Sequence, residues 1–254
     1  MELLDKIIKQ LNQSPESFKQ TSGVSGAKTY LIELGDTYYL KVWGKNRLKA
    51  DYQTLCFFSK LGFTAAPLAY KSSDKDYLLT KEIKGLPASS EQFLQNPRRL
   101  ATALGKILRR FHDMINIENC PFENSVSDMV SRVETNYKNK EFDLRLASYV
   151  NNTDIDNIYS YIMQHKDCLI NDVVLHGDYC LPNILLRDNF ELSGLLDMGA
   201  AGIGDRHYDL FWGRWSLQYN LKSDEYGDDF FSAYGNELID PARLKVIGYI
   251  SCMD

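Results

Sequence analysis

Three side chains in the second half of the chain have the types and spacing that phosphoryl transfer requires. Four residues separate Asp178 from Asn183 in the segment HGDYCLPN, and Asp197 follows in the segment DMG. A carboxylate in the first position can orient a hydroxyl and take its proton, while an amide oxygen and a second carboxylate are oxygen ligands suited to Mg²⁺. The pattern predicts Asp178 as catalytic base, with Asn183 and Asp197 as ligands of a magnesium ion.

The segment between these side chains predicts a β-hairpin. Two short apolar runs, 184–186 and 192–196, flank the turn-forming residues 187–189. Runs of this length around Arg-Asp-Asn are typical of paired strands. We expect the hairpin to bring the three polar side chains together at one end.

Composition indicates an ordinary globular protein. The chain has 254 residues, of which 44% are hydrophobic and 25% charged, and a formal net charge of −5. This charge argues against nucleic acid as the main partner and mildly favours cationic small molecules. No apolar run approaches the ~20 residues of a membrane span. Residues 1–11 predict an amphipathic helix rather than a secretory signal.

The cysteines indicate neither a disulfide scaffold nor a zinc site, because they are five in number, widely scattered and without a CxxC pair. Reduced thiols and a cytoplasmic location are therefore expected. Cys180 lies within the HGDYCLPN segment and could be mistaken for a nucleophile, but no activating histidine is evident in the sequence. The five are Cys56, Cys120, Cys168, Cys180 and Cys252.

The pattern of elements predicts an α+β fold of two lobes. In the first part, 27–34 and 37–43 read as a hairpin, 48–61 as a helix and 77–82 as another strand. From Pro97 onward the periodicity is helical, with expected helices beginning at 97 and near 126–138, 154–164 and 209–219. We expect a small β-rich N-lobe at 1–82, a larger helical C-lobe at 83–254, and a small-molecule cleft between them.

Lys41 is the candidate phosphate-binding residue of the N-lobe. It lies between Leu40 and Val42 in a predicted strand, where a lysine needs an anion to meet. A nucleotide phosphate and a carboxylate on the following helix would satisfy it, and Asp51 is the best-placed acid there. The turn 23–26 could cover phosphates with backbone N–H groups.

Taken together, these segments resemble the aminoglycoside phosphotransferase family, most closely the aminoglycoside 3′-phosphotransferases, within the protein-kinase-like fold. The resemblance runs across nearly the whole chain. It rests on TSGVSGAKTYLIEL with YYLKVW, LLTKEIKG, ILRRFHDMINIENCPFEN, HGDYCLPNILL and LLDMGAAGIGDRHYDL. It implies transfer of the γ-phosphoryl group of ATP or GTP to a hydroxyl of an aminoglycoside, with Mg²⁺. Oligomeric state is not implied.

The resemblance also implies individual roles. Asp178 matches the catalytic aspartate, Asn183 and Asp197 match the magnesium ligands, and Lys41 matches the phosphate-binding lysine. Asp51 stands where the family usually has glutamate. His176 is expected to buttress the catalytic loop, while Asp205, Arg206 and Asp209 are expected to order the segment behind it through ion pairs. The remaining nucleotide contacts implied are Ser25 near the β-phosphate, Tyr39 on the adenine ring, and the backbone of Lys81 and Ile83 at the adenine edge.

On the acceptor side, the sequence departs from the family. A polycationic acceptor needs converging carboxylates, and the family's last helix carries acidic residues near its end. Here Ser251 and Cys252 stand where that pair is expected. The remaining candidates for cation recognition are Asp224, Glu225, Asp228, Asp229 and Asp254.

Three alternatives stay open. A kinase of the same fold could act on choline, a thioribose or a macrolide sugar. A nucleotide-binding module without transferase activity would not need to retain all four of Lys41, Asp178, Asn183 and Asp197. A metal hydrolase is the third alternative, but the single histidine of the HGD segment lacks the ligand spacing that zinc requires.

Overall fold

The protein divides into two compact units in the computed structural model, which describes residues 1–14, 18–21 and 26–253. The predicted Ser25, with the neighbouring turn, and Asp254 lie outside the described residues. Unit 1 comprises Met1–Leu86, Leu185–Arg187 and Ser193–Gly199, and unit 2 comprises Pro87–Ile184, Asp188–Leu192 and Ala200–Asp254. No described helix is both long and apolar enough to cross a membrane.

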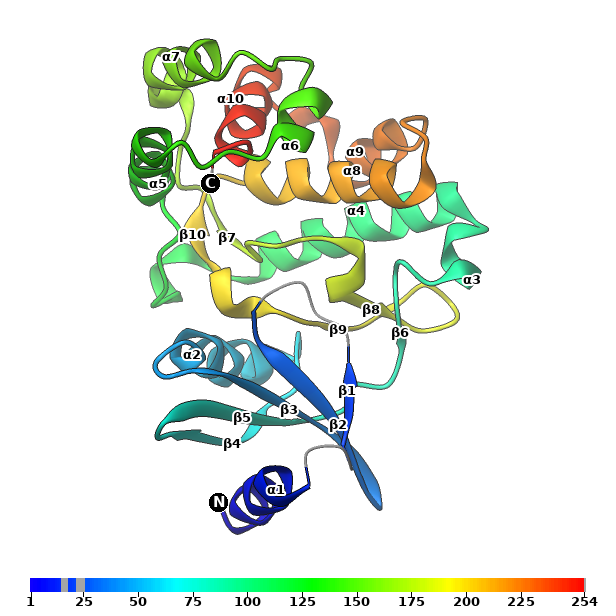
Figure 1. The fold of residues 1–254 in the computed structure, drawn as a ribbon. Helices are drawn as coiled ribbons and strands as arrows, with labels where there is room; N and C mark the ends of the chain where they lie inside the picture. Colours follow the sequence, from blue (N-terminus) through cyan, green and yellow to red (C-terminus); the bar gives the residue numbers. More distant parts are fainter. Residues whose placement is uncertain (15–17, 22–25, 254) are drawn as a thin grey trace. The chain divides into compact units, whose positions relative to one another are not determined.

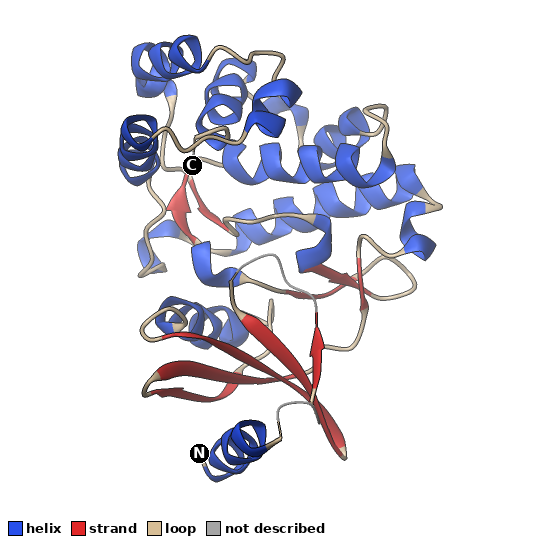
Figure 2. Ribbon diagram, viewed as in Figure 1, coloured by secondary structure: helices blue, strands red, loops and turns tan. Residues whose placement is uncertain are grey.

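Unit 1 is built on an antiparallel sheet of five strands in the order β1-β2-β3-β5-β4 (Figures 1 and 2). Helices α1 and α2 lie on opposite sides of this sheet (Figure 1). The bounds are α1 Glu2–Gln13, β1 Lys19–Thr21, β2 Lys28–Leu34, β3 Asp36–Gly44, α2 Lys49–Phe58, the 3₁₀ turn η2 Ser59–Leu61, β4 Pro67–Ser72 and β5 Lys75–Lys81.

The β2–β3 hairpin confirms the prediction of two strands joined at Gly35. Leu34 pairs directly with Asp36, and Gly35 between them has a φ of 82°, a conformation that suits glycine. The amphipathic helix predicted at the start of the chain is α1.

Alternation along β3 decides where Lys41 points. Successive side chains of a strand face opposite sides of the sheet. Leu40 and Val42 are buried in the cluster that includes Leu4 and Ile7 of α1. Lys41 therefore faces the other side, where α2 lies, and its place in an apolar strand does not require burial in the core.

Unit 2 is mainly helical. One core cluster joins α5, α7, α8 and α10 and includes Ile162, Phe211 and Ile250. The helices are α3 Glu91–Leu94, α4 Pro97–Met114, α5 Val126–Asn139, α6 Leu144–Tyr149, α7 Ile155–His165, α8 His207–Leu221, α9 Gly227–Tyr234 and α10 Pro241–Ser251. The 3₁₀ turns are η3 Ile117–Asn119, η4 Lys166–Cys168, η5 Leu181–Asn183, η6 Met198–Ala200 and η7 Asn236–Leu238.

The expected helices near 97, 126–138, 154–164 and 209–219 are confirmed, but the periodicity of the sequence did not predict α10. Residues 246–251 of α10 are all buried, so its sequence lacks the polar face that produces a helical period. Asp240 accepts hydrogen bonds from the N–H groups of Ala242 and Arg243, and this N-cap followed by Pro241 was the available signal.

Short strands carry the two polar motifs. β7 Val173–Leu175 pairs with β10 Gly202–Gly204 and runs directly into His176. β8 Ile184–Leu186 and β9 Leu192–Leu195 are neighbours in a sheet of order β6-β8-β9, with β6 at Leu86–Pro87. The predicted hairpin between 184 and 196 is thereby confirmed.

Candidate active site

The loop that carries Asp178 is closed on itself by Asn183. The amide nitrogen of Asn183 donates to the Asp178 carboxylate at 2.8 Å and to the Asp178 carbonyl at 3.1 Å. The amide oxygen of Asn183 has no hydrogen-bond partner among the described residues. The loop thus presents one carboxylate and one unengaged amide oxygen, which are the atoms needed for a base and a hard-cation ligand.

The buried carboxylate of Asp209 anchors the backbone at the start of this loop. Asp209 of α8 accepts hydrogen bonds from the backbone N–H groups of His176, at 2.7 Å, and Gly177, at 3.0 Å. Its Oδ2 also lies 3.1 Å from Nε2 of His112, whose Nδ1 is 2.8 Å from the hydroxyl of Tyr234. These side chains are buried, so the hydrogen bonds act without competition from water.

The first two residues of the HGD segment have structural tasks. The His176 ring is fully buried, and its Nδ1 accepts from the N–H of Asp178 at 3.2 Å, as a buttressing role predicts. Gly177 has a φ of 84°, and a Cβ there would lie 2.3 Å from the carbonyl oxygen of Ala200. Only glycine fits this position.

Cys180 does not have the environment of a nucleophile. Burial, followed by the nearby charge of Asp178, raises the pKa of its thiol well above the ordinary range. A thiol that stays protonated is a poor nucleophile. The structure therefore supports the interpretation that Cys180 is not a nucleophile.

Lys41 is held between two carboxylates within unit 1. Its ammonium donates to Asp51 and to Asp197, each at 2.8 Å. Burial by itself lowers the pKa of Lys41, but Asp197 and Asp51 outweigh this and raise it above the ordinary value. The predicted Lys41–Asp51 pairing is confirmed, and the shorter Asp side chain reaches the lysine.

The glycine of the DMG segment is required by that ion pair. A Cβ at Gly199 would lie 2.2 Å from Oδ1 of Asp51. Asp197 itself has a φ of 53°, which is uncommon for a residue other than glycine. Such strained positions cluster at functional sites because the surrounding structure must maintain them.

The other residues predicted to contact the nucleotide lie on or just after the same sheet. Tyr39 is half-buried in β3, and burial raises the pKa of its hydroxyl. Lys81 ends β5, and its side chain is engaged with Asp36 at 2.7 Å, which leaves only its backbone for the predicted role. Ile83 is partly buried, and its side chain fills the space where a Cβ of Gly194 would stand.

The ion pairs behind the catalytic loop have partners that the sequence did not identify. Arg206 pairs with Asp172 at 2.8 Å, and Arg243 bridges Asp172 at 3.0 Å and Asp205 at 2.8 Å. Asp209 pairs with no arginine among the described residues; its partners are backbone N–H groups and the ring of His112, at 3.1 Å. His112, Tyr234 and Arg243 carried no local signal, because their roles depend on residues far along the chain.

The predicted acidic acceptor residues within the described ranges have different surroundings. Asp224 lines two adjoining cavities, Asp229 pairs with Arg98 at 3.2 Å, and Glu225 and Asp228 are exposed. Ser251 and Cys252 are 2% and 1% exposed. An acidic pair could not face solvent at these two positions, because both belong to the interior of unit 2.

The donors available for a metal ion are oxygen atoms. The described residues contain no cluster of three or more His, Cys, Asp or Glu side chains that could hold a metal by themselves. Asn183 offers an amide oxygen and Asp197 a carboxylate. One or two such ligands, completed by substrate phosphates and water, suit Mg²⁺ rather than zinc.

Comparison with known proteins identifies related chains. Residues 18–247 match the model of the phosphotransferase enzyme family. A probable aminoglycoside 3′-phosphotransferase of Lactococcus lactis subsp. lactis (strain IL1403) is 40% identical over 223 residues, which cover 87% of this chain and 84% of that protein.

Solved structures show the same fold. The aminoglycoside-3′-phosphotransferase of type VIII superposes with a TM-score of 0.81 at 21% identity, covering 99% of both chains. An aminoglycoside phosphotransferase from Streptomyces rimosus, in complex with ADP and streptomycin, superposes with a TM-score of 0.78 at 18% identity, covering 98% of this chain and 97% of that one. The expected α+β, protein-kinase-like fold is confirmed.

Proposed function

Because the chain belongs to the phosphotransferase enzyme family and is a phosphotransferase with an alcohol acceptor, we propose that it transfers the γ-phosphoryl group of ATP or GTP to a hydroxyl of an aminoglycoside. The relative from Lactococcus lactis and the Streptomyces rimosus complex with ADP and streptomycin support this choice of acceptor and nucleotide. The observation that carries the proposal is the Asp178–Asn183 pair on a loop anchored by Asp209.

In this proposal, Asp178 acts on the acceptor. Its carboxylate accepts a hydrogen bond from the acceptor hydroxyl, aligns the oxygen with the γ-phosphorus and takes the proton as the new P–O bond forms. The bond from the γ-phosphorus to the bridging β-phosphate oxygen breaks in the same step, and the nucleoside diphosphate leaves. The hydrogen bond from Asn183 keeps the carboxylate oriented, so little reorganisation is needed at the moment of transfer.

Lys41 acts on the nucleotide. Its ammonium, now shared by Asp51 and Asp197, would contact the α- and β-phosphates while Asp51 continues to hold it. Asn183 and Asp197 would hold Mg²⁺, which when bound neutralises charge on the phosphates. Tyr39 would pack on adenine, and the backbone of Lys81 and Ile83 would bind its edge.

The test is nucleotide consumption measured with Mg²⁺ while kanamycin, neomycin, streptomycin and choline are added one at a time. Stimulation by an aminoglycoside, abolished in Asp178→Ala, is the expected result. Stimulation by choline alone would show that choline, and not an aminoglycoside, is the acceptor. Nucleotide binding without stimulation by any acceptor would contradict the proposal.

A further inference from the structure

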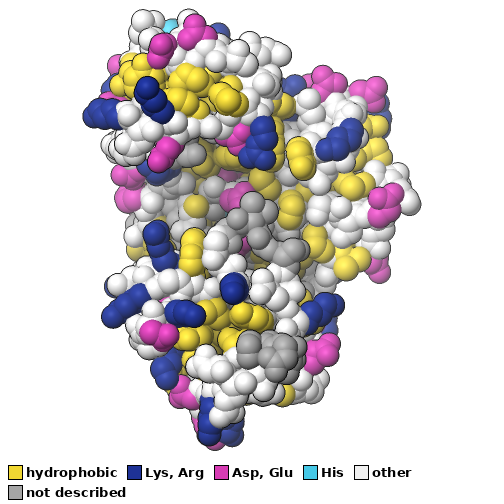
Figure 3. Space-filling view, in the orientation of Figure 1, with side chains coloured by type: hydrophobic (Ala, Val, Ile, Leu, Met, Phe, Trp, Pro, Cys, Tyr) yellow, Lys and Arg dark blue, Asp and Glu magenta, His cyan; other side chains and the backbone are white. Residues whose placement is uncertain are grey.

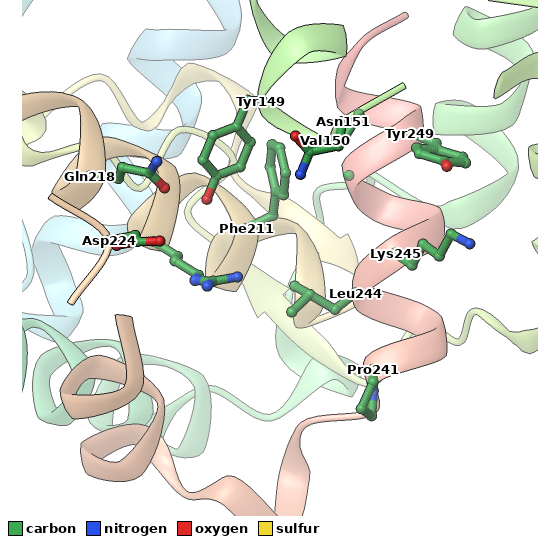
Figure 4. Close-up of a pocket in the computed structure, with 12 residues that line it drawn as sticks. Tyr149, Val150, Asn151, Phe211, Gln218, Asp224, Pro241, Leu244, Lys245 and Tyr249 are labelled. Atoms are coloured by element: carbon green, nitrogen blue, oxygen red, sulfur yellow. The ribbon is translucent and has the colours of Figure 1, made fainter. Parts of the chain in front are cut away.

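Asp76 of β5 is a charged residue of unit 1 that the proposed mechanism does not use. Charged side chains of this protein generally lie on the surface, as over the face drawn in Figure 3, or border a cavity, as Asp224 and Lys245 do in Figure 4. Asp76 is instead 0% exposed. A buried carboxylate is costly unless its oxygens are hydrogen-bonded or paired. The contacts of Asp76 therefore indicate what an acid does there.

The partners of Asp76 differ from those of Asp205 and Asp209, which are also 0% exposed. Asp205 pairs with Arg243 at 2.8 Å, and Asp209 lies 3.1 Å from the ring of His112. Asp76 has no cationic partner among the described residues, and its donors are neutral. An ion pair therefore does not explain its burial.

Two donors share the Asp76 carboxylate. Oδ1 accepts from the hydroxyl of Ser72 on the neighbouring strand β4 at 2.6 Å, and Oδ2 accepts from the backbone N–H of Leu48 at 2.9 Å. Burial by itself would raise the pKa of Asp76, but these hydrogen bonds, with one from the backbone of Asn46, outweigh it and leave the pKa below its ordinary value. Asp76 is therefore an anion at neutral pH.

The contact with Leu48 lies at the start of α2. Leu48 is the N-cap of this helix, and its side chain provides no capping hydrogen bond. In a capping box, the side chain of the third helical residue accepts from the N–H of the N-cap residue. In α2 the third residue is Asp51, the partner of Lys41. Asp51 therefore stands where it could cap α2 or hold Lys41, and it holds Lys41.

Helix α5 shows the alternative use of the same position. Its N-cap is Ser125, and Asp128, its third residue, accepts from the N–H of Ser125 at 3.2 Å in a capping box. In α2 the corresponding N–H goes to Asp76, which belongs to a different element. An aspartate at the third helical position thus caps α5, whereas in α2 a carboxylate from β5 takes over that contact.

Sheet geometry places Asp76 on the same side as Lys41. In the antiparallel β3–β5 pair, Lys41 lies opposite Leu78, and side chains two residues apart in a strand share a face. Asp76 therefore faces α2, as Lys41 does. Asp51 has little freedom of movement, because a Cβ at Gly199 would lie 2.2 Å from its Oδ1. A shift of Asp51 toward the start of α2 would lengthen its contact with Lys41.

We propose that Asp76 is a positioning residue for phosphate binding, which accepts the N–H of Leu48 and so leaves the carboxylate of Asp51 to hold Lys41. This inference rests on the proposed function, in which Lys41 contacts the nucleotide phosphates. Without the Asp76 carboxylate, the N–H of Leu48 and the ammonium of Lys41 compete for Asp51. Lys41 is then held less firmly, and the nucleotide binds more weakly.

The first experiment measures the affinity for ADP with Mg²⁺ by calorimetric titration, which needs no acceptor. Asp76→Ala should weaken ADP binding about tenfold, the change that corresponds to one hydrogen bond to a charged group. Asp74→Ala is the matched control, because Asp74 is an exposed acid in the preceding turn and accepts from Ser73 at 2.8 Å. It should leave the affinity unchanged. A folded Asp76→Ala protein with a lower melting temperature but unchanged ADP affinity would overturn the inference.

A milder variant decides the question if Asp76→Ala does not fold. Asp76→Asn keeps an acceptor oxygen for the N–H of Leu48, and its amide group can donate to the hydroxyl of Ser72. We expect a loss of ADP affinity of about threefold, because a neutral acceptor forms a weaker hydrogen bond than a carboxylate. In that case, unchanged affinity in Asp76→Asn would overturn the inference.

A double-mutant cycle tests whether Asp76 acts through Asp51. Asp51→Asn by itself should weaken ADP binding. Adding Asp76→Ala to Asp51→Asn should cause a further loss of less than about twofold, because residues that act through one another have non-additive effects. A further tenfold loss would show that the two residues act independently and would contradict the inference.

The inference and the proposed function fail in different ways. Phosphorylation of an aminoglycoside by the unsubstituted protein, together with ADP affinity that Asp76→Ala does not change, would overturn the inference alone. The expected ADP affinities without consumption of nucleotide in the presence of any acceptor would overturn the proposed function alone. No binding of ADP by the unsubstituted protein would overturn both.

Discussion

The candidate residues of unit 1 and those of unit 2 are stabilised in opposite ways. In unit 1, Lys41 is held by ion pairs with Asp51 and Asp197, and the side chain of Asp197 is 53% exposed. In unit 2, the loop carrying Asp178 is held by hydrogen bonds from its own backbone to Asp209, which is fully buried.

This difference indicates which of the two sets of contacts a bound ligand can replace. The side chain of Asp197 is 53% exposed, whereas that of Asp51 is 16% exposed. Because exposed ion pairs are individually weak, incoming phosphates can replace Asp197 beside Lys41 at little cost. A buried carboxylate that accepts two backbone N–H groups is costly to disturb. The contacts of Lys41 with Asp197 are therefore exchangeable, whereas the loop that carries Asp178 is preorganised.

The largest effect is expected for Asp178→Ala. Removing the base should lower kcat by roughly 10²–10⁴-fold, while nucleotide affinity changes little because Lys41 and the sheet of unit 1 are untouched. Steady-state kinetics and nucleotide titration measure the two quantities, with the exposed Asp188→Ala as control. A large loss of nucleotide affinity would show that Asp178 has another role.

Asp209→Asn tests preorganisation of the loop. The amide cannot accept from both N–H groups as the carboxylate does, so the free energy of unfolding should fall by about 3 kcal/mol, with a loss of kcat larger than any change in KM. Urea unfolding and kinetics provide the measurements. His112→Gln, which keeps a hydrogen-bonding group beside Asp209, should have a smaller effect. A fully stable Asp209→Asn enzyme with normal kcat would refute the anchoring role.

Lys41→Met tests the contacts of Lys41 that a bound nucleotide can replace. We expect nucleotide affinity and turnover to fall together, by about 10²-fold in kcat/KM. Stability should fall as well, because the carboxylate of Asp51, which is only 16% exposed, loses its cation. Lys71→Met is the matched control, since Lys71 is also a strand lysine paired with a carboxylate, Asp5, at 2.7 Å. Similar kinetic losses in both variants would remove the special role of Lys41.

The smallest expected effect is a loss of folding stability at low pH. Burial alone would raise the pKa of Asp205, but hydrogen bonds and the charge of His207 outweigh it and leave the pKa below its ordinary value. The folded state therefore gains stability above the unfolded carboxyl pKa of about 3.9 and loses it as pH falls through the lower folded value. Asp205→Asn should make the melting temperature depend less on pH in the acid range, as measured by thermal unfolding at several pH values. Asp188→Asn should leave this dependence unchanged.

Local patterns predicted most elements but not all. The β2–β3 hairpin and α4 were foreseen because one has a glycine turn between alternating strands and the other a clear amphipathic period. β4 was missed, and α10 was missed because its last turns are buried on every side. A sequence pattern reports burial only when one face of an element stays polar.

The sequence alone predicted the chemistry of the candidate site, because residue type and spacing single out Asp178, Asn183, Asp197 and Lys41. Only the tertiary structure decided which other residues hold these four side chains in position. Asp209 lies 33 residues after His176, whose backbone N–H it accepts. His112 contacts Asp209 from a second helix, and Tyr234 contacts His112 from a third. It also placed Arg214 and Lys222 with Asp224 in the lining of two cavities of unit 2. Such contacts depend on how distant elements pack, and no local pattern records that.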